Sequence, residues 1–78
     1  MTASAVLQHV PTRFDPDQLL KARLDAGLTL RDVAAVTGWN HGTVNRYERG
    51  VIDPTAGVLA VLADLYRVAP GKLFTTAG

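Results

Sequence analysis

Apolar residues recur at three- and four-residue steps along several stretches of the chain, the spacing that predicts amphipathic helices. The first stretch predicts a helix over residues 16–26. Asp15 can accept hydrogen bonds from the free amides at its start, Pro16 suits its first position, and Gly27 can end it in a left-handed conformation. The helical part of the chain therefore begins at a well-marked boundary.

Two short helices follow with only a brief connection between them. The spacing of Thr29 and Asp32 is that of a capping box, which predicts a helix over residues 30–37. Asn40 can cap a third helix over residues 41–49, which a glycine ends. Two helices joined so closely are the sequence form of a helix-turn-helix.

The second half of the chain predicts one longer helix and one short one. Thr55 can cap a fourth helix, whose apolar stripe extends from Val58 to Tyr66. Pro70 can open a last short helix that continues to Phe74. Because no stretch shows the strict alternation of a strand, we expect an all-α bundle of five short helices.

Residues 1–13 show no helical periodicity. Their apolar stretch from Ala5 to Val10 could pack or pair as a short strand, but an arm that is flexible or only loosely docked is the interpretation we favour. We therefore divide the chain into an N-terminal arm over residues 1–13 and one helical domain over residues 14–75.

Composition narrows the classes of function. The 78 residues fit one domain. Because the chain has no cysteine, and because His9 and His41 lack companions at ligand spacing, we expect no bound metal. The sequence has no Ser/His/acid arrangement and no glycine-rich phosphate loop, so we expect that the protein is not an enzyme and binds no cofactor. The sequence shows no membrane span and no signal peptide, which predicts a cytoplasmic protein without a membrane partner. The net charge of +1 alone gives little support to a nucleic-acid partner.

The predicted third helix separates its side chains into two faces. On a helical wheel of about 100° per residue, His41, Asn45, Arg46 and Arg49 gather on one polar face together with Gly42. These side chains supply donors for base edges and phosphates, and the missing side chain of Gly42 would let the backbone approach DNA closely. A merely solvated polar face is the alternative, and the wheel alone does not decide between them. The opposite arc holds Thr43, Val44, Tyr47 and Glu48.

Several short motifs carry a resemblance to a known family. They are Gly27-Leu28-Thr29, Val33-Ala34, Gly38, Thr43-Val44, Arg46-Tyr47-Glu48-Arg49-Gly50 and Pro54. Together they resemble the Cro and phage-repressor type of helix-turn-helix, also called the xenobiotic-response-element family, over about residues 19–74. The resemblance implies a five-helix domain of the lambda-repressor type. Such a domain binds operator DNA, usually as a homodimer, and represses or activates transcription.

The resemblance also assigns roles to residues of the predicted helix-turn-helix. Asn40 and His41 would stand at the start of the recognition helix and reach bases and phosphates. Asn45 and Arg46 would face base edges. Thr43 and Arg49 would meet the sugar-phosphate backbone, and Thr29, Arg31 and Gly42 complete the candidate DNA-binding residues.

Two positions depart from the pattern of this family. Leu30 stands where the family often has a Gln that reaches a phosphate, and Arg31 beside it could substitute only with a different geometry. The loop Val51-Ile52-Asp53 is not basic, whereas the family often has basic residues there. Both departures reduce the expected number of phosphate contacts.

Arg23 and Glu48 are charged residues in an otherwise apolar setting. Related domains pair these two positions across the first and third helices, and Glu48 lies on the inward arc of the wheel. We therefore expect a partly buried structural ion pair that fixes the angle of the recognition helix.

We expect a sequence-specific DNA-binding transcription regulator, a repressor that binds double-stranded operator DNA through the third helix as a homodimer. The alternative is an antitoxin-like or accessory protein-interaction module on the same fold, docked through residues 1–13 or the surface of residues 66–74. The near-neutral charge and the missing Gln favour the alternative slightly, whereas the run of residues 46–50 favours DNA.

Overall fold

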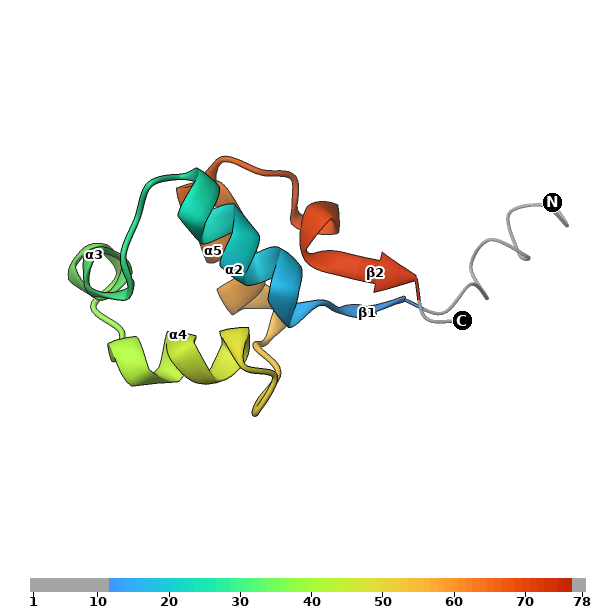
Figure 1. The fold of residues 1–78 in the computed structure, drawn as a ribbon, viewed down its shortest axis with the longest axis horizontal. Helices are drawn as coiled ribbons and strands as arrows, with labels where there is room; N and C mark the ends of the chain where they lie inside the picture. The colour runs from blue at the N-terminus through green and yellow to red at the C-terminus, as the bar shows by residue number, and fades with distance from the viewer. Residues whose placement is uncertain (1–11, 77–78) are drawn as a thin grey trace, which may run out of the picture.

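The computed structural model describes residues 12–76, so the predictions for residues 1–11 lie outside the described part of the chain. The described residues form four α-helices, one short 3₁₀ helix and a two-stranded antiparallel sheet (Figure 1). In chain order these elements are β1 (Thr12–Phe14), α2 (Pro16–Asp25), α3 (Leu30–Thr37), α4 (His41–Glu48), α5 (Ala56–Tyr66), η1 (Pro70–Leu73) and β2 (Phe74–Thr76).

Local capping interactions set the ends of the α-helices. The Asp15 side chain accepts a hydrogen bond from the amide of Asp17 at 3.0 Å, and the Thr55 hydroxyl accepts one from the amide of Val58 at 3.2 Å. Gly27 follows α2 with a φ of +74°, in the left-handed region that glycine adopts without strain. The four predicted α-helices are therefore confirmed, with ends within about two residues of the prediction.

The C-terminal end of the domain differs from the prediction of a fifth short helix through Phe74. A 3₁₀ turn forms over Pro70–Leu73, and Phe74 already begins β2. The expectation that the domain has no strand is therefore wrong. Strands of three residues are too short to show alternation, and β1 and β2 lie at opposite ends of the domain sequence. The paired residues are Thr12 with Thr76, Arg13 with Thr75 and Phe14 with Phe74, so the last two residues of the predicted arm belong to this sheet.

One apolar core joins the helices. Its largest fully buried side chains come one from each helical element: Leu19 from α2, Val33 from α3, Val44 from α4, Leu62 from α5 and Leu73 from η1. Burial of aliphatic side chains of this size contributes about 1.5–3 kcal/mol each. Val44 thus anchors the centre of α4 in the core, and the partly buried Tyr47 packs against the same core.

The arrangement leaves α4 on one side of the molecule. α4 packs against α2 and α3, while α5 packs against η1 and α2. The β1–β2 sheet extends away from the helices at one end, and α3 lies at the other end (Figure 1). The outer side of α4 is therefore open to a ligand.

Candidate nucleic-acid interface

α4 separates its buried and accessible side chains as the helical wheel predicts. Val44 and Glu48 are buried and turn one side of the helix toward the core. The only acidic residue of the helix, Glu48, therefore does not lie on the outer side. That side carries hydrogen-bond donors and two guanidinium groups, from residues that are exposed (His41, Arg46 and Arg49) or half-buried (Asn45).

The start of α4 gives Gly42 a local role. The side-chain oxygen of Asn40 accepts a hydrogen bond from the amide of Gly42 at 2.7 Å, which caps the helix. A Cβ at Gly42 would lie 3.0 Å from this same oxygen, a contact that would disturb the cap. The tight cap is thus a structural reason for glycine, beside the close approach to DNA that the sequence suggests. The side-chain NH₂ of Asn40, which is exposed, can donate to a ligand.

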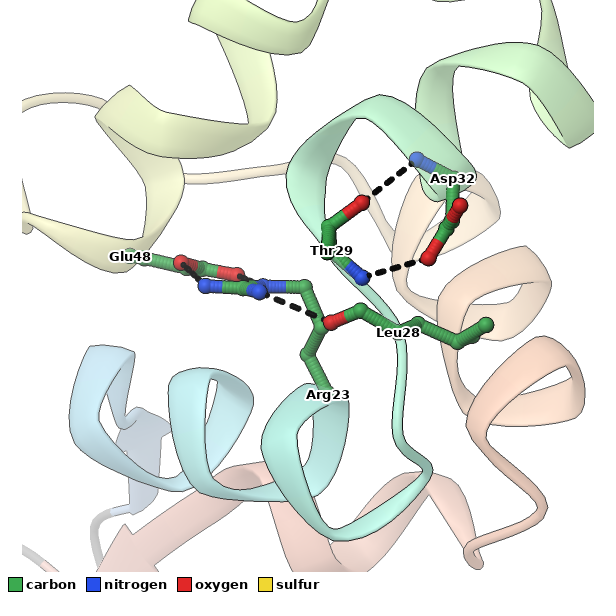
Figure 2. Close-up of polar contacts among 5 residues, drawn as sticks. All are labelled: Arg23, Leu28, Thr29, Asp32 and Glu48. Carbon is green, nitrogen blue, oxygen red and sulfur yellow. Dashed lines mark hydrogen bonds and ion pairs between the residues drawn. The ribbon is translucent and has the colours of Figure 1, made fainter.

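A capping box opens α3 and engages Thr29 (Figure 2). The Thr29 hydroxyl accepts from the amide of Asp32 at 3.0 Å, and the Thr29 amide donates to the Asp32 carboxylate at 2.8 Å. Hydrogen bonding to the Thr29 backbone, and then to its side chain, lowers the pKa of Asp32. The Thr29 amide therefore already has an anionic partner. Arg31, in the same first turn of α3, is exposed, and Thr43 on α4 is half-buried.

Arg23 of α2 and Glu48 of α4 form a buried two-point ion pair (Figure 2). The Arg23 Nε donates to one carboxylate oxygen at 2.7 Å, and Nη2 donates to the other at 3.0 Å. These hydrogen bonds raise the pKa of Arg23 despite its burial. Parallel hydrogen bonds between a guanidinium and a carboxylate are strong and directional. The structure thus brings together the two residues that the resemblance pairs.

The same guanidinium makes a third hydrogen bond, to a second residue, that the sequence does not reveal. Nη1 of Arg23 donates to the carbonyl oxygen of Leu28 at 2.9 Å, in the connection that leads into α3 (Figure 2). One side chain therefore links α2, the entry to α3 and, through Glu48, the end of α4. Because Glu48 lies one turn from Asn45 and beside Arg49, this link fixes the direction of the outer side of α4.

Tyr66, at the end of α5, lies near this ion pair. Its hydroxyl is buried and has no hydrogen-bond partner among residues 12–76. Burial, followed by the negative charge of Glu48, raises its pKa to about 12. The side chain belongs to the core and is not available to the docking surface suggested for residues 66–74. Sequence periodicity places Tyr66 in the core stripe but cannot show where its hydroxyl points.

Residues 12–76 contain neither a metal-binding cluster nor a membrane-spanning helix. No group of three or more His, Asp or Glu side chains could hold a metal ion in this part of the chain. No helix of the same part is long and apolar enough to cross a membrane.

Comparison with known proteins agrees with the arrangement of α3 and α4. Residues 17–74 match a family model described as a helix-turn-helix domain, from the first turn of α2 to the start of β2. The match thus covers the Arg23–Glu48 pair and the outer side of α4. No curated protein matches the chain.

Proposed function

This chain belongs to a Cro/C1-like helix-turn-helix domain family, and membership of this family indicates DNA binding. On this premise we propose that it is a sequence-specific transcription regulator. The observation that carries the proposal is the outer side of α4. It presents two exposed arginines, Arg46 in α4 and Arg49 at its C-terminal cap, and the buried ion pair fixes the orientation of this short helix. A rigidly placed helix with such donors is suited to the major groove.

The accessible residues divide into two roles. Arg46 and Asn45 are suited to base edges, because a guanidinium recognises guanine and an amide recognises adenine through paired hydrogen bonds. Arg49 and Thr43 are suited to the sugar-phosphate backbone, which positions the helix without reading sequence. The start of α4 supplies further donors from Asn40 and His41, and Arg31 lies on the neighbouring α3.

Regulation then follows from occupancy of the DNA. Two copies on half-sites about one helical turn apart, roughly 34 Å, would place two α4 helices in successive major grooves. A homodimer bound in this way represses transcription by covering an operator. The number of phosphate contacts is small, because Leu30 packs against the core and the loop after α4 is not basic. We therefore expect modest affinity for a single half-site.

Selection from a random DNA library at two salt concentrations tests the proposal. We expect the wild-type protein to enrich one motif and to lose affinity steeply as salt rises, because bound arginines release counterions from the DNA. The matched control is the double variant Arg46→Ala/Arg49→Ala, whose two sites are exposed and whose fold should persist. A folded wild-type protein that enriches no sequence at low salt would contradict the proposal and favour an antitoxin-like or accessory protein-interaction module.

A further inference from the structure

Two aromatic residues beside α4 are half-buried: Trp39 just before its cap and Tyr47 in its last turn. Both pack against the apolar core. Within residues 12–76 neither the Trp39 indole N–H nor the Tyr47 hydroxyl has a hydrogen-bond partner, and neither is buried, since the Tyr66 hydroxyl is the one buried polar side-chain atom there without a partner. Aromatic side chains with one apolar and one water-exposed end are typical of binding surfaces, where the polar end finds a partner.

The backbone holds Trp39 at the start of α4, in the short connection from α3 (Figure 1). The Thr37 hydroxyl donates to the Val33 carbonyl at 2.8 Å and accepts from the Trp39 amide at 3.1 Å. The next residue, Asn40, caps α4. The indole therefore starts from a fixed turn between the two helices of the helix-turn-helix.

Tyr47 lies on a flank of α4. The wheel places its side chain about 80° from the buried direction that Val44 and Glu48 mark, and about 100° from Arg46 on the outer side. Thr43 stands four residues earlier on the same flank, about 6 Å along the helix axis. Because both side chains carry a hydroxyl, this flank offers neutral hydrogen-bond donors beside the arginines of the outer side.

The ligand that suits these donors is the phosphate backbone of DNA. A helix in the major groove turns its outer side to the base edges and its flanks to the sugar-phosphate strands that border the groove. Phosphate oxygens accept hydrogen bonds, the indole N–H only donates, and a tyrosine hydroxyl can donate. Charged phosphate contacts are few here, since Leu30 packs against the core and the loop after α4 is not basic. Neutral donors therefore have phosphates left to contact.

We propose that Trp39 and Tyr47 donate hydrogen bonds to DNA phosphates and so position α4 in the major groove. The inference rests on the proposed function, because it adds contacts to the same helix and the same ligand. Neutral donors release no counterions, so their share of the affinity does not fall as salt rises. Phosphate contacts carry no sequence information, so this share is equal on selected and on random DNA.

The experiment measures the Kd of wild type, Trp39→Phe and Tyr47→Phe for a duplex with the selected motif and for a random duplex of equal length, at several salt concentrations. Each variant removes one donor and keeps an aromatic ring in the core. We expect each to weaken binding to both duplexes about three- to tenfold and to leave the salt slope unchanged. Arg49→Ala, in contrast, should reduce the slope by about one. The matched control is Tyr66→Phe, which removes a hydroxyl buried in the core and should bind like wild type.

A second measurement needs no substitution, so it does not depend on the folding of a variant. Trp39 is the only tryptophan of the chain, and tryptophan fluorescence therefore reports its surroundings alone. We expect its emission to move to shorter wavelength when DNA saturates the wild-type protein, because the half-exposed indole loses water. Unchanged emission at saturation would overturn the inference.

The remaining outcomes separate the inference from the proposed function. A folded wild-type protein that binds neither duplex would overturn both. Wild-type affinity in either folded aromatic variant would overturn the inference alone. So would a loss confined to the selected duplex, which would assign the donor to a base edge. A reduced salt slope would mean that the variant displaces an arginine, and would also overturn the inference.

Discussion

Tyr66 shows how one buried polar atom affects stability. Its hydroxyl has no hydrogen-bond partner among residues 12–76, and burying such a group costs about 1–3 kcal/mol. We therefore expect Tyr66→Phe to leave the free energy of unfolding unchanged or to raise it by about 1 kcal/mol. Urea denaturation measures this difference. A loss of more than about 1 kcal/mol would mean that the hydroxyl has a partner in solution.

The same residue predicts a dependence on alkaline pH. The folded state raises the pKa of Tyr66 from 10.0 to about 12, so the unfolded chain loses this proton first as the pH rises. The contribution of Tyr66 to stability is therefore fully present below pH 10 and is lost as the pH approaches 12. The loss amounts to about 2–3 kcal/mol. Tyr66→Phe should lack this component of the alkaline decrease, and identical decreases in the two proteins would contradict the assignment.

The Arg23–Glu48 ion pair is the other residue-scale feature whose loss should change the free energy of unfolding. Glu48→Ala leaves the guanidinium of Arg23 buried without its anion, which destabilises by about 3–5 kcal/mol. In a domain of this size, we expect the variant to be largely unfolded near room temperature by circular dichroism. The double variant Arg23→Met/Glu48→Leu should be more stable than Glu48→Ala, because no unpaired charge is left. Unchanged melting of Glu48→Ala would contradict the structural role of the pair.

At the scale of elements, the residue that caps the end of α5 has a strained backbone conformation that a substitution can relieve. Arg67 has a φ of +59°, in the left-handed region that favours glycine. We expect Arg67→Gly to raise stability by about 0.5–1 kcal/mol, or a melting temperature increase of about 2–8 °C for a domain of this size. Gly27→Ala is the opposite control, since its φ of +74° makes any side chain unfavourable. A lower melting temperature for Arg67→Gly would show that the arginine side chain contributes more than the strain costs.

Elements also show what sequence can and cannot predict. The α-helices are capped at their starts by Asp15, Thr29, Asn40 and Thr55, whose capping bonds span two or three residues, so the signal is local. The β1–β2 sheet depends on pairing between the two ends of the domain, and three-residue strands carry no periodicity. The short 3₁₀ turn at Pro70–Leu73 likewise resembles the start of an α-helix in sequence. Local contacts were therefore predicted from the residues themselves, whereas the distant Arg23–Glu48 pair was predicted only through the family resemblance and the β1–β2 pairing was not predicted.

At the scale of the whole molecule, the candidate site also combines features that one helix determines with features that depend on contacts between elements. The wheel of α4 predicts which residues face outward, because it depends on one helix alone. The third bond of Arg23, to the Leu28 carbonyl, depends on how three elements meet and has no sequence signal. The exposure of Val51 is similar, since an apolar residue after a helix usually predicts packing rather than a free surface. The outward side chains of α4 are thus predictable from one helix, whereas the Leu28 bond and the exposure of Val51 are not.

The central claim for the whole molecule is that the outer side of α4 reads DNA sequence. The direct test measures the affinities of wild type, Arg46→Ala and Arg49→Ala for a selected duplex and for a random duplex of equal length. We expect Arg46→Ala to lose about 1–3 kcal/mol on the selected duplex and little on the random one, because its contact reads a base edge. Arg49→Ala should weaken both alike and reduce the salt slope by about one. Equal losses on both duplexes for Arg46→Ala would contradict the claim.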